Sequence, residues 1–136
     1  MSKKILIVGS KYYDDIYQNL LKGALETIKN AKFEYEICEA PGSLEIPYVI
    51  KKNINNYSGF VALGCVIRGE TYHFELIANE CARKIIDLSV DYNKPVGLGI
   101  LTCDSYEQAF VRSDPLQKNK GKEAADACIK LLTDVY

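Results

Sequence analysis

The sequence contains a single histidine, and none of its five cysteines forms a Cys-x-x-Cys pair. Zinc sites and thioredoxin-like redox motifs use closely spaced cysteine or histidine residues, so we expect neither in this chain. Four of the cysteines lie in apolar segments, where a free thiol packs as a small hydrophobic group. We therefore expect buried thiols without a chemical role, and no bound metal ion.

The sequence also lacks an excess of basic charge and any long apolar run. Its net charge is −1 and no charge-dense tail is present, which weighs against a nucleic acid or a membrane surface as a partner. No apolar run approaches the roughly 20 residues that span a bilayer. The first residues, Met-Ser-Lys-Lys-Ile, do not resemble a secretory signal. We therefore expect a cytoplasmic protein with no nucleic-acid and no membrane partner.

Nucleotide-binding motifs and internal repeats are missing as well. Neither a phosphate loop with its lysine nor a G-x-G-x-x-G motif occurs, so the sequence does not call for a nucleotide cofactor. There are no repeats, low-complexity tracts or interdomain linkers, and 136 residues is the length of one domain. A single domain over residues 1–136 is the prediction.

What the chain does contain is a regular alternation of apolar runs and helical patterns. Strands are predicted over 4–8, 33–38, 61 to the turn at Gly69, and 95–101. The second strand alternates apolar with charged residues, the pattern of a strand with one wetter face, and is expected at an edge. Helices are predicted over 14–30, from the Pro-Gly turn to about residue 52, from the turn at Gly69 to about residue 90, over 106–112 and from about 119 onward. This order predicts an α/β fold, in which a four-stranded parallel sheet has helices on both faces as a three-layer sandwich.

The segment from Val61 to about residue 90 is predicted to be a strand, a glycine turn and a helix. Ligands bind open α/β sheets at the carboxyl ends of the strands, where this turn lies. Gly69, Glu70 and Thr71 open the helix and form a potential anion site. His73 lies in the first turn, and histidine suits acid–base chemistry near neutral pH. A structural role for a lone histidine is an equally good interpretation.

Two other strand-to-helix turns carry candidate ligand-binding residues. Tyr12 and Tyr13 follow the first strand and either cap a helix against the sheet or offer an aromatic platform to a flat ligand. Glu45 follows a Pro-Gly turn and Ser43, which can cap the next helix. Its carboxylate either compensates the helix dipole or accepts hydrogen bonds from ligand hydroxyls. The residues alone thus predict a small-molecule site but no particular reaction.

The strand predicted at 95–101 contains Gly97 and Gly99 on either side of Leu98. Missing side chains at alternate strand positions usually mean close packing of backbone against another element. They also let a ligand or a neighbouring chain approach, and the sequence leaves both interpretations open.

Five segments together resemble the lumazine synthase family, in order and at fitting separations. They are Ala40–Pro47, Ala62–Glu75, Pro95–Thr102, Glu107–Arg112 and Asn119–Ala125. The resemblance implies a flavodoxin-like fold and an enzyme of riboflavin biosynthesis. The family condenses 5-amino-6-(D-ribitylamino)uracil with 3,4-dihydroxy-2-butanone 4-phosphate to 6,7-dimethyl-8-ribityllumazine, phosphate and water, without a metal or cofactor.

The resemblance also implies roles for residues at matching positions. They are Tyr12 stacking on the pyrimidine; Ser43, Leu44 and Glu45 on the ribityl chain; Gly69, Glu70, Thr71 and Arg112 on the phosphate side; His73 in proton transfer; and Lys120 at the border of the site. Leu98 stands where many relatives have phenylalanine, so aliphatic contact replaces stacking there. Tyr13 stands where asparagine is usual.

The family builds its site between neighbouring subunits of a pentamer. By resemblance, Tyr12, Glu45 and His73 come from one chain, and Leu98, Arg112 and Lys120 from the next. The short N-terminus favours a pentamer over a shell of twelve pentamers, and Pro115 lies in the bend that bears on shell formation.

The main alternative is a non-catalytic flavin- or lumazine-binding protein on the same scaffold. His73, Arg112 and Lys120 argue against it, because a ligand without phosphate needs no such cluster. A flavodoxin-type electron carrier is less favoured, because no serine- and threonine-rich phosphate loop is present.

Overall fold

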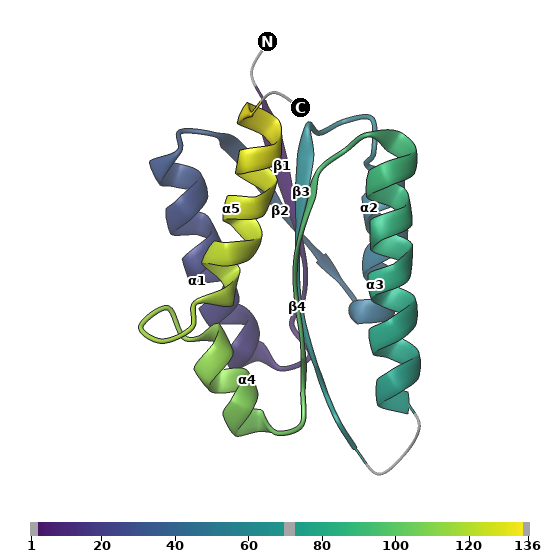
Figure 1. Cartoon of the computed structure of the whole chain (residues 1–136), viewed down its shortest axis with the longest axis vertical. Coiled ribbons are helices and arrows are strands. Elements are labelled where there is room, and N and C mark those ends of the chain that lie inside the picture. Colours follow the sequence, from purple (N-terminus) through teal and green to yellow (C-terminus); the bar gives the residue numbers. More distant parts are fainter. Residues whose placement is uncertain (1–2, 70–72, 135–136) are drawn as a thin grey trace.

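A four-stranded parallel sheet lies between two helical layers in this computed structural model, which describes residues 3–69 and 73–134 (Figure 1). The sheet has the order β2-β1-β3-β4. Its strands are β1 (Lys4–Ser10), β2 (Glu34–Ala40), β3 (Gly59–Ile67) and β4 (Val96–Cys103). All three pairs of neighbouring strands are parallel, which confirms the predicted sheet.

The helices divide between the two faces of the sheet. One face is covered by α1 (Asp14–Asn30), α4 (Tyr106–Ser113) and α5 (Lys120–Thr133), and the other by α2 (Ile46–Lys52) and α3 (His73–Tyr92) (Figure 1). A short 3₁₀ helix, η1 (Ser43–Glu45), precedes α2. This arrangement confirms the three-layer α/β sandwich.

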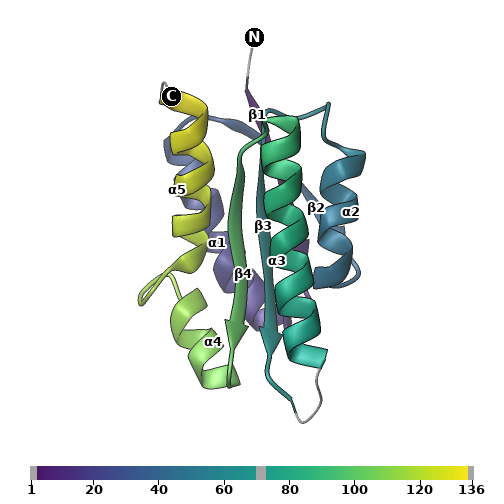
Figure 2. The same ribbon diagram turned by 45° about the vertical axis from the view of Figure 1, so that its right-hand side comes forward.

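The burial of each strand follows from its place in the sheet. β3 is central and is buried along almost its whole length, as expected of a strand covered on both faces. β2 lies at an edge, which confirms the prediction for this strand, and its residues are exposed or only partly buried up to the buried Ala40. β4 forms the opposite edge, between α5 and α3 (Figure 2).

Side chains cap the N-termini of α4 and α5. The Ser105 hydroxyl accepts a hydrogen bond from the backbone N–H of Gln108 and caps α4. The Asn119 side chain accepts from the backbone N–H of Lys122 and caps α5. Both caps lie on the helical layer that packs against β4.

All five cysteines are free thiols, and four of them are buried, which agrees with the expectation for the apolar segments. Burial raises the pKa of Cys65 and Cys128 to about 12 and that of Cys81 to about 11. These three thiols therefore stay protonated at neutral pH. Cys38 on the edge strand β2 is half-buried.

Two glycines let α5 approach its neighbours at backbone distance. A Cβ atom on Gly97 would lie 1.9 Å from the backbone oxygen of Ala124, and a Cβ on Gly121 would lie 2.0 Å from that of Leu20. Real Cβ atoms do not come this close to a carbonyl oxygen. Gly97 thus serves tight packing of β4 against α5, which is the first of the two interpretations left open by the sequence.

No helix within residues 3–69 and 73–134 combines the length and the apolar character needed to cross a membrane.

Candidate active site

A hollow of about 380 Å³ lies at the carboxyl ends of the strands, where the sequence predicted a ligand site. The turn after β1, the turn before α2, the end of β3 and the start of α3 form its walls. The hollow is lined by Ser10, Tyr12, Tyr13, Gly42, Ser43, Leu44, Glu45, Cys65, Val66, Ile67, His73 and Ile77. Five of the predicted site residues, Tyr12, Ser43, Leu44, Glu45 and His73, are therefore brought together here.

Two tyrosines form the wall next to β1. The Tyr12 side chain is 77% exposed, and its ring meets that of Tyr13 edge-to-face, with centroids 4.9 Å apart and planes at 80°. Burial raises the pKa of Tyr13, so its hydroxyl stays protonated at neutral pH. Tyr13 packs against the Tyr12 ring, and most of the Tyr12 ring surface remains exposed and could contact a flat ligand.

The segment Ser43–Glu45 differs from the predicted helix cap. Ser43 is buried as the first residue of η1, and neither η1 nor α2 has a side-chain cap. The buried Cys81 thiol of α3 instead donates a hydrogen bond to the Ser43 carbonyl oxygen at 3.1 Å. This tertiary contact connects the turn to α3, and Leu44 and Glu45 are exposed beside the hollow.

His73 is the first described residue of α3, and its side chain is exposed at the hollow. This confirms the prediction that the histidine lies in the first turn of a helix after β3. Glu70 and Thr71 lie outside the described residues. Gly69 is exposed, and a Cβ there would meet no atom within 4 Å, so its described surroundings give no steric reason for glycine.

A second hollow of about 400 Å³ runs along the outer edge of β4 and contains the other predicted residues. Leu98 of β4, Arg112 of α4 and Lys120 of α5 line it, with Glu123 beside them. The Lys120 Nζ atom lies 3.1 Å from the Glu123 carboxylate. The two hollows share no lining residue, so a single chain separates the predicted residues into two groups.

Several lining residues were not singled out from the sequence. Ile77 lies one helical turn after His73, and this spacing was a usable signal for its place in the hollow. Glu123 lies three residues after Lys120, which is the spacing of an ion pair on a helix. Cys65 had no such signal, because the sequence of a buried strand does not show whether a hollow lies at that position.

Over the two described stretches, no three His, Cys, Asp or Glu side chains gather as a metal site.

Comparison with known proteins identifies the family. A family model described as 6,7-dimethyl-8-ribityllumazine synthase matches residues 2–135. The chain belongs to this family. It is 45% identical over 137 residues to the 6,7-dimethyl-8-ribityllumazine synthase of Bartonella tribocorum, and the alignment covers 97% of this chain and 91% of that protein.

Other relatives in the family are similar over the same extent. The 6,7-dimethyl-8-ribityllumazine synthase of Novosphingobium aromaticivorans is 48% identical, with 95% of this chain and 94% of that protein covered. The corresponding protein of Zymomonas mobilis is 47% identical, with 94% and 93% covered. The family resemblance inferred from the five segments is thereby confirmed.

A solved structure with a similar fold comes from outside the family. The crystal structure of a 3-dehydroquinate dehydratase-like protein from Bifidobacterium longum aligns with a TM-score of 0.53, covering 97% of this chain and 99% of that one. The two sequences are 16% identical. This likeness supports the flavodoxin-like architecture of the lumazine synthase family and carries no information about the reaction.

Proposed function

We propose that the chain catalyses the condensation of 5-amino-6-(D-ribitylamino)uracil with 3,4-dihydroxy-2-butanone 4-phosphate to 6,7-dimethyl-8-ribityllumazine, phosphate and water. Membership of the 6,7-dimethyl-8-ribityllumazine synthase family over nearly the whole chain is the observation that carries this proposal. The substrates are two small molecules, and the reaction belongs to riboflavin biosynthesis.

The first hollow suits the pyrimidine substrate. Its volume of about 380 Å³ is in the range of small-molecule sites. We propose that the Tyr12 ring stacks on the pyrimidine, while Ser43, Leu44 and Glu45 hold the ribityl chain. The ionised Glu45 carboxylate can only accept hydrogen bonds, and the ribityl hydroxyls have O–H groups that donate them.

His73 and Arg112 have different proposed roles toward 3,4-dihydroxy-2-butanone 4-phosphate. The 5-amino group attacks the ketone to form an imine, and we propose that His73 relays the protons of this step. Phosphate then leaves, and the Arg112 guanidinium stabilises its charge together with the segment Gly69–Thr71. Loss of phosphate leaves an enol, which tautomerises to a new ketone at the carbon next to the imine. Attack of the ribitylamino nitrogen on this new carbonyl closes the ring, and loss of a second water, after the one released with the imine, gives the lumazine. Lys120 borders this site.

We propose that the complete site forms between neighbouring subunits of a homopentamer. The two hollows lie on different parts of the chain and share no residue, which supports an arrangement in which one subunit's first hollow faces the next subunit's second hollow. Apolar side chains exposed on α3, β4 and α4 support self-association. They are Leu76, Ile86, Val90, Leu98, Phe110 and Val111.

We further propose a single domain over residues 1–136 in a cytoplasmic enzyme. The two clusters of buried apolar side chains lie on opposite faces of one sheet, which supports one folding unit. Five free thiols support a reducing compartment.

Mixing two inactive variants should restore activity if the site is shared between chains. Glu45→Lys spoils the first hollow and Arg112→Ala the second, so each variant alone assembles only defective sites. In a random 1:1 ring, about a quarter of the sites combine two intact halves, because each site takes one half from each neighbour. Co-expression followed by an activity assay measures this recovery. Mixed rings seen by native mass spectrometry without recovered activity would contradict the shared site.

His73→Ala should lower turnover roughly 10- to 100-fold and leave a measurable rate, because proton transfer is one contribution and the positioning of two substrates is another. Lumazine absorbance and fluorescence follow the reaction of purified protein with both substrates. Loss of all detectable activity in a correctly assembled His73→Ala protein would contradict this division. Wild-type protein that forms no product above the uncatalysed background would instead favour a non-catalytic lumazine-binding protein.

A further inference from the structure

Arg68, just after the end of β3, connects this strand with the end of β4 and the start of α3. Its backbone N–H donates to the Cys103 carbonyl oxygen at 2.9 Å, so its own main chain continues the β3–β4 ladder. Its Nε donates to the Asp104 carboxylate at 2.9 Å, just after β4. Its Nη1 forms a short ion pair with Glu75 in the first turn of α3.

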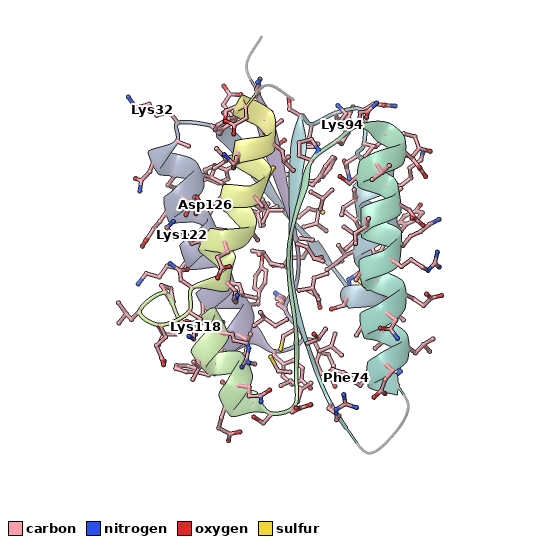
Figure 3. All side chains as sticks on the ribbon, viewed as in Figure 1. Lys32, Phe74, Lys94, Lys118, Lys122 and Asp126 are labelled. Atoms are coloured by element: carbon pink, nitrogen blue, oxygen red, sulfur yellow. The ribbon has the colours of Figure 1, made fainter. Side chains whose placement is uncertain are left out.

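The same guanidinium also lies over an aromatic ring. Its central carbon is 4.4 Å from the centroid of the Phe74 ring, within the range of cation–π contacts. Figure 3 shows Phe74 at the lower end of α3, beside the carboxyl end of the sheet. The planar guanidinium can pair with two carboxylates and stack on a ring at once, which the ammonium group of lysine cannot do.

These contacts involve the N-terminal part of α3, where no described side chain is buried in the core. The buried residues of α3 are Cys81, Ile85 and Leu88, so the first two described turns place no side chain fully in the core. Phe74 and Glu75 directly follow His73 in that first turn. The position of His73 relative to the sheet therefore depends on the residues that Arg68 holds.

The charges in this cluster remain in place at neutral pH. The backbone N–H of Glu75 and the Arg68 guanidinium lower the pKa of the Glu75 carboxyl, so this group is ionised there. Asp104 also receives a second constraint, because its backbone N–H donates to the Gln108 side chain of α4 at 2.8 Å. The anchor for Arg68 is thus itself tied to the helix that carries Arg112.

We infer that Arg68 is a positioning residue, which holds the first turn of α3 against the ends of β3 and β4 and so sets the place of the His73 imidazole. The inference rests on the proposed condensation for its effect on catalysis. Its structural part, the link from Arg68 to His73, is independent of the reaction.

Arg68→Gln tests the inference, with Arg83→Gln as the matched control. Arg83 also pairs with two carboxylates, Glu80 at 3.0 Å and Asp87 at 3.4 Å, but all three residues lie on α3, so these pairs do not connect α3 to another element. We expect Arg68→Gln to lower kcat about fivefold with a much smaller change in KM for the pyrimidine substrate. Arg83→Gln should leave both constants unchanged. Glu75→Gln should reproduce the loss of kcat, because it breaks the same link from the helix side.

The double variant separates positioning from a general structural role. A residue that acts through His73 has nothing to act on once the imidazole is gone, so Arg68→Gln should not lower kcat further in the His73→Ala background. An equal, additive loss in both backgrounds would overturn the inference. So would a rise in KM for the phosphate substrate in both backgrounds, which would mean direct contact of Arg68 with that substrate.

A spectroscopic measurement tests the structural link without any reaction. His73 is the only histidine, so tag-free protein gives a single imidazole Cε1–H NMR signal that needs no assignment to a residue. This signal should shift or broaden in Arg68→Gln and stay unchanged in Arg83→Gln. An unchanged signal in Arg68→Gln would overturn the inference even if the wild-type enzyme is active. Inactive wild-type protein with a shifted signal would contradict the proposed function alone.

Discussion

Arg112→Ala should lower kcat for lumazine formation roughly 100-fold or more, because the leaving phosphate then develops its charge without a guanidinium to stabilise it. The side chain is exposed on α4, and its Nη1 donates to the Gln108 carbonyl of the same helix at 3.4 Å. This weak local contact means that removing the side chain leaves the fold intact. The loss is therefore a loss of transition-state stabilisation.

Substrate-resolved kinetics check this expectation. KM for the phosphate substrate should rise as well, whereas the affinity for the pyrimidine should change little, because its proposed contacts lie in the first hollow. Arg112→Lys keeps one positive charge but loses the two-pronged geometry, so its rate should fall between those of wild type and alanine. An Arg112→Ala enzyme that is impaired only in pyrimidine binding would contradict the proposed role.

Gly97→Ala and Gly121→Ala should each lower the free energy of unfolding by about 3 kcal/mol, or prevent folding altogether. Both new methyl groups would meet backbone, 1.9 Å from the Ala124 oxygen and 2.0 Å from the Leu20 oxygen. A side chain could rotate away from such a clash, but a carbonyl in the middle of a helix cannot. The whole of α5 would have to move off β4 or α1.

Urea unfolding at one fixed protein concentration measures these effects, because the stability of an oligomer depends on concentration. Gly69→Ala is the matched control, since a Cβ there meets no atom of the described residues within 4 Å and the described glycines have no positive φ. Its free energy of unfolding should stay within about 0.5 kcal/mol of wild type. A Gly97→Ala protein as stable as Gly69→Ala would show that the backbone contact is not rigid.

The order of strands and helices could be predicted because burial leaves a periodic mark on the sequence. β3 is an unbroken apolar run since both its faces are covered, and β2 alternates since it lies at an edge. The cap at Ser105 also follows from local chemistry. The cap expected at Ser43 was wrong because Ser43 is itself the first residue of η1, and the N-cap positions of η1 and α2 fall to Gly42 and Glu45.

The candidate site was predictable from pattern only in part. Tyr12, Glu45 and His73 follow the carboxyl ends of strands, where any parallel sheet collects its ligand-binding residues. Arg112 and Lys120 lie on helices at the outer edge of β4, and no periodicity distinguishes them from ordinary surface charges. They were identified through resemblance to the family. The separation of Arg112 and Lys120 from the first hollow is visible only in the structure, because it depends on β4 being the edge strand.

The separation of the two hollows has a consequence for mixed populations of chains. In a ring whose sites take one half from each of two neighbours, a chain damaged in both hollows inactivates the site on either side of it. The working fraction of sites then falls as the square of the fraction of intact chains, and not in proportion to it. A chain damaged in only one hollow inactivates one site instead of two, and where two different lesions fall in the same site, two damaged chains cost only that one site.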